Sequence, residues 1–362
     1  MTAPVKAEVQ VPVTARAAQL LARWETLLAV LLLALIILAA TTAPGFLGDF
    51  NVSTSLAQIS EKALFALPLA LLLICREIDI SVASTAALSG ITLGMALQAG
   101  LPVAVAVVVA VGTGLLCGAL NGVLVTVLKL PSLVVTLGTL ALFRGLCYVA
   151  VGGQPISDIA PGLIALGNDD VPGLVLPLAL LPFLVLAPIF TVVLQRTPTG
   201  RQLYAIGGSP ETAHYAGVRS RRLVLALFVV TGGVAAIAGV ILTGRTAQAS
   251  PDSGLGFELD ALTMVFLGGI SVLGGKGRLT SVLLAVALIA TLRSYLQLLG
   301  VSGYAQSTAI GLVLILSLLG TNLAEQIQAR VSGQRRRRRL LHEPADGLAC
   351  LQAGPHVPTP DR

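Results

Sequence analysis

Long apolar segments follow one another along most of this chain, and they constrain its fold more than any other feature. A helix that spans the hydrocarbon of a bilayer needs about 20 apolar residues. Ten apolar segments can be recognised, at 26–43, 63–75, 82–98, 101–127, 132–151, 174–195, 223–243, 261–273, 279–299 and 304–321. We therefore expect an all-α polytopic membrane protein with about 10 transmembrane helices. Segments 63–75 and 261–273 are too short to span alone as straight helices, which predicts broken or short helices in two related halves.

The composition supports a membrane protein. Charged residues make up 11% of the 362 residues, whereas a soluble domain carries roughly 25%. The net charge of +6 does not indicate a nucleic-acid partner, because the basic residues are confined to a few short segments. Membrane lipid is the expected surrounding instead. The cysteines Cys75, Cys117, Cys147 and Cys350 show neither metal-ligand spacing nor the pattern of a disulfide framework.

The distribution of basic residues predicts the orientation in the membrane. They cluster before the first segment, between the sixth and seventh, and after the tenth. Because basic loops stay on the cytoplasmic side, both termini are expected in the cytoplasm. Single charges such as Lys62 and Arg245 fall near predicted outer ends. No cleavage site follows the first segment, so it is not predicted to be a removed signal.

Three regions result from this orientation. Residues 1–25 are expected to form a cytoplasmic arm, residues 26–325 a transmembrane domain with a cytoplasmic loop at 196–222, and residues 326–362 a basic tail. The tail is expected to be disordered. Its arginine run at 335–339 either acts as a simple stop-transfer signal or contacts anionic lipid.

A charged break separates two of the apolar segments. Arg76, Glu77 and Asp79 lie between 63–75 and 82–98. Charges at membrane depth are costly unless they face protein or water, so a chain that keeps them is expected to use them.

The break has a weak echo in the second half of the chain. The triplet Ile-Ser-Val at 80–82 recurs at 270–272. Broken segments at matching places point to a central path, although chance similarity of apolar sequence is an equal alternative. Asp79, Ser81, Asn121 and Ser271 are therefore candidates to line or brace a translocation path. Asp79 alternatively caps the helix that begins near Ser81, and Asn121 alternatively bonds a neighbouring helix.

Pairs of glycines predict close helix packing. Gly90 and Gly94 lie four residues apart in one segment, and Gly114 and Gly118 in the next. Small residues at this spacing let two helices approach closely in a membrane.

The cytoplasmic loop contains a helix start. Ser209 is a good N-cap, Pro210 suits the first helical position, and Glu211 lies at the positive end of the helix. Gly217 is suited to end it. A short amphipathic helix of about two turns is therefore predicted, which either docks into a groove of a cytosolic partner or rests on lipid.

The sequence offers little for catalysis. His214, His342 and His356 lie in the loop and the tail, and no cluster has metal-ligand spacing. The run at 274–277 is superficially similar to a phosphate-binding loop, but Gly277 replaces the Ser or Thr that would hold magnesium. No catalytic residue, metal or cofactor is expected.

Several short runs in one order resemble a known family. They are 76–82, 121–125, 129–131, 135–140, 200–207, 211–217, 254–260 and 267–275. Over about residues 50–325 the chain resembles the membrane permease subunits of bacterial ATP-binding-cassette (ABC) sugar importers, of the ribose, xylose, autoinducer-2 and rhamnose group. One departure is Glu77, which stands where this family usually has glycine; it favours a rhamnose-like subgroup and puts the geometry of the break in doubt.

The resemblance implies a function. The chain would translocate a monosaccharide such as rhamnose or ribose, with a cytosolic ABC ATPase subunit, a periplasmic or extracellular sugar-binding protein and a second permease subunit, identical or related. ATP would be hydrolysed on the separate ATPase, so the chain itself is not an enzyme. The residues that match the family's coupling loop are Gly200, Arg201, Ala205, Gly207, Glu211, Ala213, Gly217 and Arg219.

Two other classes of membrane protein find less support in the sequence. A secondary transporter driven by an ion gradient and carrying a small polar solute would need ionisable residues in several helices. Outside 76–79 the segments offer mainly Arg144 and Arg293. A polytopic membrane enzyme lacks a credible set of catalytic residues.

Overall fold

The computed structural model describes residues 24–316 and 319. The predicted arm up to residue 23 and the predicted tail at 326–362 lie outside the described residues. The chain divides into two compact units, Met1–Leu314 and Ile315–Arg362.

The described residues form helices joined by short loops, with isolated bridges at Ile156–Ala249 and Asp170–Pro177. The helices are α2 (Trp24–Thr42), α3 (Asp49–Ile74), α4 (Val82–Gln98), α5 (Val103–Thr126), α6 (Ser132–Val151), α7 (Pro161–Asn168), η1 (Leu178–Leu180), α8 (Leu181–Arg196), α9 (Pro198–Gly208), α10 (Pro210–Tyr215), α11 (Ser220–Thr246), α12 (Phe257–Leu267), α13 (Leu279–Leu298) and a further helix, Gly303–Leu316.

Each of the ten predicted segments contains one apolar helix, which confirms the all-α membrane fold. Seven described helices are long and apolar enough to cross a membrane. α4 and the helix Gly303–Leu316 are shorter. α12 has only 11 residues, as its segment predicted.

The first predicted short segment, 63–75, is wrong in length. α3 begins at Asp49 and has 26 residues. Hydropathy missed its first half because residues 49–62 contain serines, Glu61 and Lys62. These side chains do not face lipid: the most apolar part of α3 is 94% buried. The neighbouring helices α11, α12 and α13 supply its surroundings.

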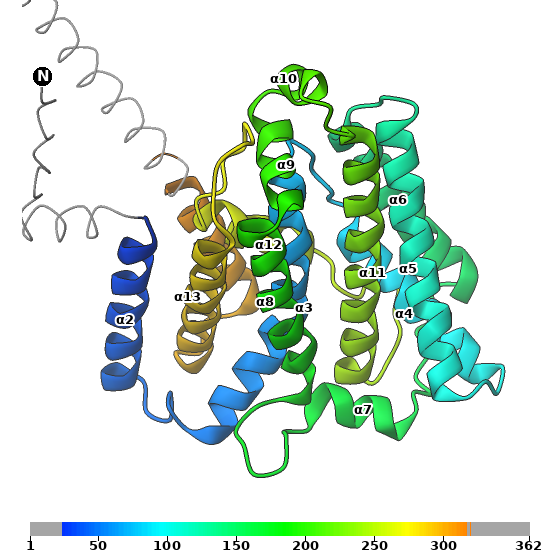
Figure 1. The fold of residues 1–362 in the computed structure, drawn as a ribbon. Helices are drawn as coiled ribbons and strands as arrows, with labels where there is room; N and C mark the ends of the chain where they lie inside the picture. The colour runs from blue at the N-terminus through cyan, green and yellow to red at the C-terminus, as the bar shows by residue number, and fades with distance from the viewer. Residues whose placement is uncertain (1–23, 317–318, 320–362) are drawn as a thin grey trace, which may run out of the picture. The chain divides into compact units, whose positions relative to one another are not determined.

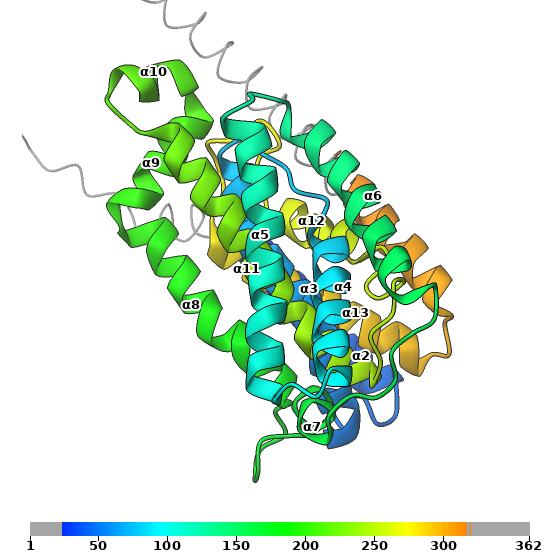
Figure 2. The same cartoon turned by 90° about the vertical axis from the view of Figure 1, so that its right-hand side faces the viewer.

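The helices are arranged around α3 and α11. Figure 1 shows α2 and α13 on one side of them and α4, α5 and α6 on the other. The turned view in Figure 2 places α9 and α10 at one end and α7 at the opposite end. We call these the α10 end and the α7 end. α11 runs between them and packs against α3, α4, α5 and α7.

Glycines allow α11 to touch α5 along its length. A Cβ atom added to Gly114 would lie 2.3 Å from the carbonyl oxygen of Gly232, and one added to Gly118 would lie 2.2 Å from that of Phe228. Gly90 of α4 faces Thr243 of α11 in the same way. The predicted close packing is confirmed, and it removes any space for a larger side chain at these positions.

Replacing Gly114 by alanine should loosen this contact. The added methyl group would clash with backbone on α11, and overpacking of this kind costs about 1–3 kcal/mol. The matched control is Gly112→Ala on the same helix, where an added Cβ meets nothing within 4 Å. Thermal unfolding of the detergent-solubilised variants should show Gly114→Ala well below wild type and Gly112→Ala at or above it. Equal unfolding temperatures would contradict the contact.

Candidate functional site

The charged break begins with a tight helix end. The N–H of Arg76 donates to Leu73 O at 2.9 Å, and the N–H of Glu77 donates to Leu72 O at 3.0 Å. This pattern ends a helix with one residue in the left-handed conformation, which is usually glycine. Here that residue is Arg76, with φ 67°. Glu77 follows in the extended segment and therefore does not need glycine's freedom.

Beyond the turn, an extended segment carries the first predicted path residues to the start of α4. Asp79 Oδ1 accepts hydrogen bonds from the N–H of Ser81 at 2.8 Å and from its Oγ at 2.6 Å. Asn121 of α5 donates from Nδ2 to Ser81 Oγ at 2.8 Å. All three side chains are buried. The structure thus joins Asp79, Ser81 and Asn121 in one polar cluster, in which Asp79 braces the residue that precedes α4.

One acceptor of this cluster is left over. Asn121 Oδ1 is buried, and the described residues provide no hydrogen-bond donor for it. A buried carbonyl without a partner is uncommon in folded proteins. Asn121 Oδ1 is therefore an acceptor that the described residues leave unused and shield from the surface.

Ser271 lies apart from the cluster. It belongs to the loop between α12 and α13, where its N–H donates to Lys276 O and its Oγ accepts from the N–H of Leu273. The repeated triplet also has different surroundings in the two halves. Ser81 directly precedes a helix, whereas seven residues separate Ser271 from Leu279, the first residue of α13.

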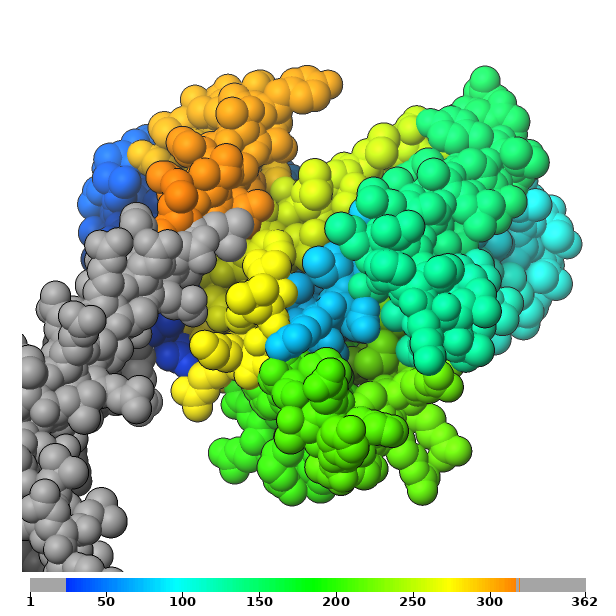
Figure 3. Space-filling model, turned by 90° about the horizontal axis from the view of Figure 1, so that it is seen from above, coloured from blue at the N-terminus to red at the C-terminus, as the bar shows by residue number. Residues whose placement is uncertain are grey.

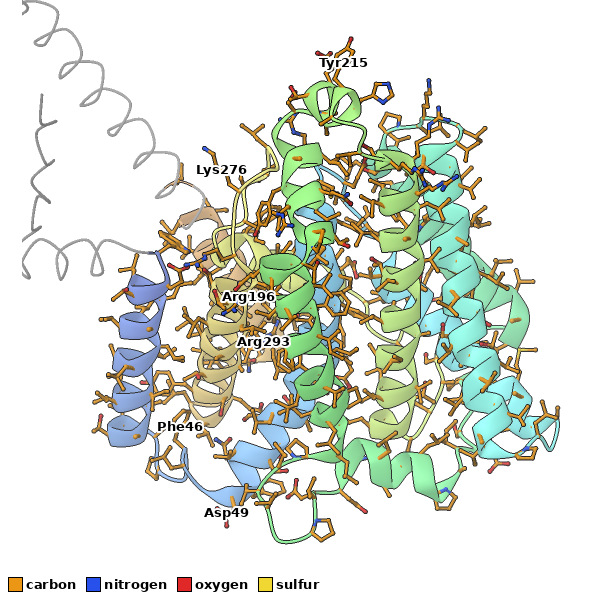
Figure 4. The ribbon with its side chains drawn as sticks, viewed as in Figure 1. Phe46, Asp49, Arg196, Tyr215, Lys276 and Arg293 are labelled. Carbon is orange, nitrogen blue, oxygen red and sulfur yellow. The ribbon has the colours of Figure 1, made fainter. Side chains whose placement is uncertain are left out.

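The predicted cytoplasmic helix is present and shorter than expected. α10 has six residues, and Ser209 caps it by accepting from the N–H of Thr212 at 3.2 Å. Gly217 ends the turn that follows, with φ 78°. Tyr215 is 89% exposed at the tip of α10, as Figure 4 shows.

The sequence analysis missed α9, which precedes α10. Its 11 residues begin with Thr197 as N-cap and Pro198 at the first position. The pair Ser209-Pro210 carries the same signal at the start of α10. The Thr-Pro pair could therefore have identified α9 from the sequence.

The predicted coupling residues divide into two groups by burial. Gly200, Gly207 and Ala213 are buried, whereas the other five are exposed. The exposed residues are Arg201, Ala205, Glu211, Gly217 and Arg219. Beside α10 an open recess is lined by His214 and residues 217–222, among them Arg219, Arg221 and Arg222. Only the exposed group can meet a partner, and the surface around it is basic.

A network of ion pairs lies inside the bundle, which the sequence analysis did not predict. Lys62 of α3 pairs with Asp260 of α12 at 3.0 Å, and Arg293 of α13 bonds both carboxylate oxygens of Asp260 at 2.7 Å. The Lys62 ammonium also lies 4.4 Å from the ring centre of Phe257. Asp260 is thus shared by two basic side chains from different helices.

A second ion pair joins α3 to α11. Arg245 Nε donates to Glu61 Oε1 at 2.7 Å, and Glu61 is fully buried. Lys62 and Arg245 were predicted near outer ends, each close to an acidic residue or a polar loop. Both have an acidic partner and Arg245 lies in the last turn of α11, but Lys62 lies in the middle of α3 and not near its end. Sequence distance hid these pairs, because residue 61 meets residue 245 and residue 62 meets residue 260 only in the folded bundle.

The ion pairs border a hollow in the bundle. Figure 4 shows Arg293 between the two ends, with Tyr215 and Lys276 at one and Phe46 and Asp49 at the other. A cavity of about 480 Å³ is lined by Lys62, Phe257, Asp260, Arg293 and Ser307, among others. Seen from the α10 end, Figure 3 shows a hollow between the helix at 303–314 and α6, with the yellow segment around α12 between them.

The described residues contain no group of three His, Cys, Asp or Glu side chains that could hold a metal ion. Membrane-length helices, a polar interior and a helix pair at one end define a multi-pass membrane permease. The chain belongs to the family described as branched-chain amino acid transport system / permease component, which matches residues 51–318.

Curated relatives of the chain are import permeases. It is 35% identical to the ribose import permease protein RbsC of Bacillus subtilis over 287 residues, which are 79% of this chain and 88% of the relative. It is 32% identical to the RbsC of Haemophilus influenzae over 80% of this chain and 91% of the relative. It is 34% identical to the autoinducer 2 import system permease protein LsrD of Escherichia coli (strain K12), over 83% and 92%. No solved structure matches significantly.

Removing the shared carboxylate should destabilise the bundle. Asp260→Asn leaves Lys62 and Arg293 without their negative partner in a largely buried place, and breaking a buried ion pair on one side costs about 3–5 kcal/mol. Asp158→Asn removes an equal charge from an exposed position and serves as the control. Thermal unfolding in detergent should separate the two variants by several degrees. If Asp260→Asn has the same unfolding temperature as wild type, the network contributes nothing to stability.

Proposed function

We propose that this chain is the membrane-spanning permease subunit of an ABC importer that carries a monosaccharide, such as ribose or rhamnose, across the bacterial cytoplasmic membrane. The observation that carries the proposal is the capped helix pair α9–α10, which presents exposed charged and aromatic residues at one end of the bundle. The family description names amino acids. The relatives that align over about four fifths of the chain import ribose and autoinducer 2, which favours a sugar.

The path for the sugar would follow the hollow beside α12. Asp79, Ser81 and Asn121 brace or line it near the start of α4; all three are buried, so Asn121 Oδ1 would meet a sugar hydroxyl only when the surrounding helices separate during transport. Sugars carry hydroxyl groups on all sides, so a wall of paired polar groups can exchange hydrogen bonds with them without covalent chemistry. Ser271 would act as a brace in its own loop. The hollow is open on one side of a single chain, and a second permease subunit, identical or related, would close it.

The ATPase would bind α10. Glu211, Tyr215 and Arg219 face outward there, and the arginine-lined recess suits acidic groups on the partner. The buried Gly200, Gly207 and Ala213 would instead hold the helix pair on the bundle. A sugar-binding protein would deliver the substrate at the α7 end. In this orientation both termini are cytoplasmic and ATP is hydrolysed on the separate subunit.

The ion pairs favour one alternative, a secondary transporter driven by an ion gradient. That class needs ionisable residues buried in several helices, and α3, α11, α12 and α13 supply them. Each acid in the network already has a basic partner, which is typical of a structural role. Proteoliposomes that contain the whole importer distinguish the two: uptake of a labelled sugar that requires ATP inside and no ion gradient supports the ABC importer, and uptake driven by a gradient without ATP overturns it.

A bulky residue on α10 should uncouple the importer. Glu211→Trp adds an indole to the face proposed to dock the ATPase, so ATP-driven sugar uptake should fall about tenfold or more, which corresponds to roughly 1.4 kcal/mol. Membrane insertion should be unchanged. Leu116→Trp, at a 72% exposed position on α5, is the control for bulk alone. Uptake that survives Glu211→Trp would rule out docking at this face.

Cysteine labelling tests the orientation. The starting variant lacks Cys350, and its other cysteines, Cys75, Cys117 and Cys147, are buried. Two variants are made from it, in which a single cysteine replaces either the exposed Tyr215 or the exposed Asp252. A membrane-impermeant maleimide should label position 252 in intact spheroplasts and position 215 only after lysis. The reverse pattern would invert the proposed topology.

A further inference from the structure

Three segments that are distant in sequence meet at the α10 end. They are the end of α3, the end of α9, and the loop between α12 and α13. Arg76 joins the first two: its Nε donates to Gly207 O at 2.7 Å and its Nη2 donates to Gly208 O at 2.9 Å. The last carbonyls of a helix carry partial negative charge and lack partners in the helix, so a guanidinium is a favourable partner for them.

The third segment closes the junction through backbone contacts. The N–H of Gly275 donates to Ile74 O at 2.9 Å. A Cβ atom added to Gly207 would lie 1.7 Å from Ile74 O and 2.5 Å from the nitrogen of Gly275, so the three backbones touch. A Cβ on Gly274 would lie 2.4 Å from Cγ of Arg76, which shows that the Arg76 side chain is seated on this loop.

One side chain of α9 adds a second link to the same loop. Tyr204 Oη donates to Gly277 O at 2.7 Å. Burial raises the pKa of the Tyr204 phenol, while nearby Arg278 lowers it to a smaller extent. The phenol therefore keeps the proton that it donates across the physiological range. α9 is thus tied to the break after α3 by Arg76 and to the loop after α12 by Tyr204.

The junction leads directly to the polar cluster. Arg76 is three residues before Asp79, and the segment between them is held on α6: the N–H of Ile78 donates to Ser132 Oγ at 3.2 Å, and Thr136 Oγ1 donates to Ile78 O at 3.3 Å. Asp79 in turn holds Ser81 and the start of α4. A displacement of α9 would therefore pull on residues 77–81, a short segment whose hydrogen bonds limit its freedom to move.

The backbone conformation of Arg76 indicates that its side chain does more than end α3. With φ 67°, this position suits glycine, which adopts such a conformation without the steric cost that a Cβ brings. The chain carries a long basic side chain there, and that side chain bonds another helix. A residue needed only to end α3 would not require the guanidinium.

We propose that Arg76 is a positioning residue for energy coupling: it transmits movement of the α9–α10 pair to residues 77–81 and so to the proposed path. This inference rests on the proposed function, in which an ATPase moves α10. Arg76 itself contacts neither ATP nor the sugar.

The test compares Arg76→Gly with wild type in proteoliposomes that contain the complete importer. Glycine keeps the left-handed turn and removes the two hydrogen bonds to α9. Thermal unfolding should stay at or above wild type, while sugar molecules transported per ATP hydrolysed should fall about fivefold or more, which corresponds to roughly 1 kcal/mol of lost interaction. The sugar is the one that wild type takes up from a labelled panel of ribose, rhamnose and xylose.

Two further variants complete the test. Arg76→Lys keeps the charge with a single ammonium and should recover part of the coupling ratio. Lys129→Gly, which removes an exposed basic side chain from another left-handed position with φ 56°, should leave the ratio unchanged. A normal ratio in Arg76→Gly overturns the inference, as does a loss of coupling that Arg76→Lys does not improve at all. If wild type itself shows no ATP-driven uptake, the proposed function fails first.

Discussion

The burial of α3 is the constraint on which the rest of the structure depends. This helix carries Glu61 and Lys62 side by side in the middle of the bundle, and neither charge can be left to lipid. Arg245 of α11 pairs with Glu61, and Asp260 of α12 pairs with Lys62. Arg293 of α13 also pairs with the Asp260 carboxylate. The ion pairs therefore determine which helices must surround α3.

Close packing on α11 follows from the same need. Because α11 pairs with α3 on one side and packs on α4 and α5 on the other, its backbone must lie close to theirs. Glycines at 114, 118 and 232 allow it, because their backbones touch where a methyl group would not fit. Polar pairing thus selects the partners, and small residues set how near they come.

The ends of the helices carry the functional chemistry. α3 stops at Arg76 and α9 stops at Gly208, and the two ends meet with the loop after α12. From this meeting point the chain continues into the Asp79–Ser81–Asn121 cluster. Helix interiors in this protein form the packed scaffold, and unsatisfied backbone groups at helix ends make the contacts that join α3, α9 and the loop after α12.

Sequence alone determined the membrane fold, the order of ten apolar helices and the capped start of α10, because each depends on local pattern. It named Asp79, Ser81, Asn121 and Ser271 as candidates, but the contact of Asn121 with Ser81 joins residues 40 positions apart and comes from the tertiary structure. It placed 63–75 as a short segment because hydropathy treats every side chain as if it faced lipid. Only the tertiary structure decided that Lys62 and Arg245 are paired inside the bundle, that Ser271 lies apart from the cluster, and that Arg76 rather than Glu77 takes the left-handed turn. Contacts of this kind depend on which distant residues meet, and the periodicity of one helix does not indicate which other helix packs against it.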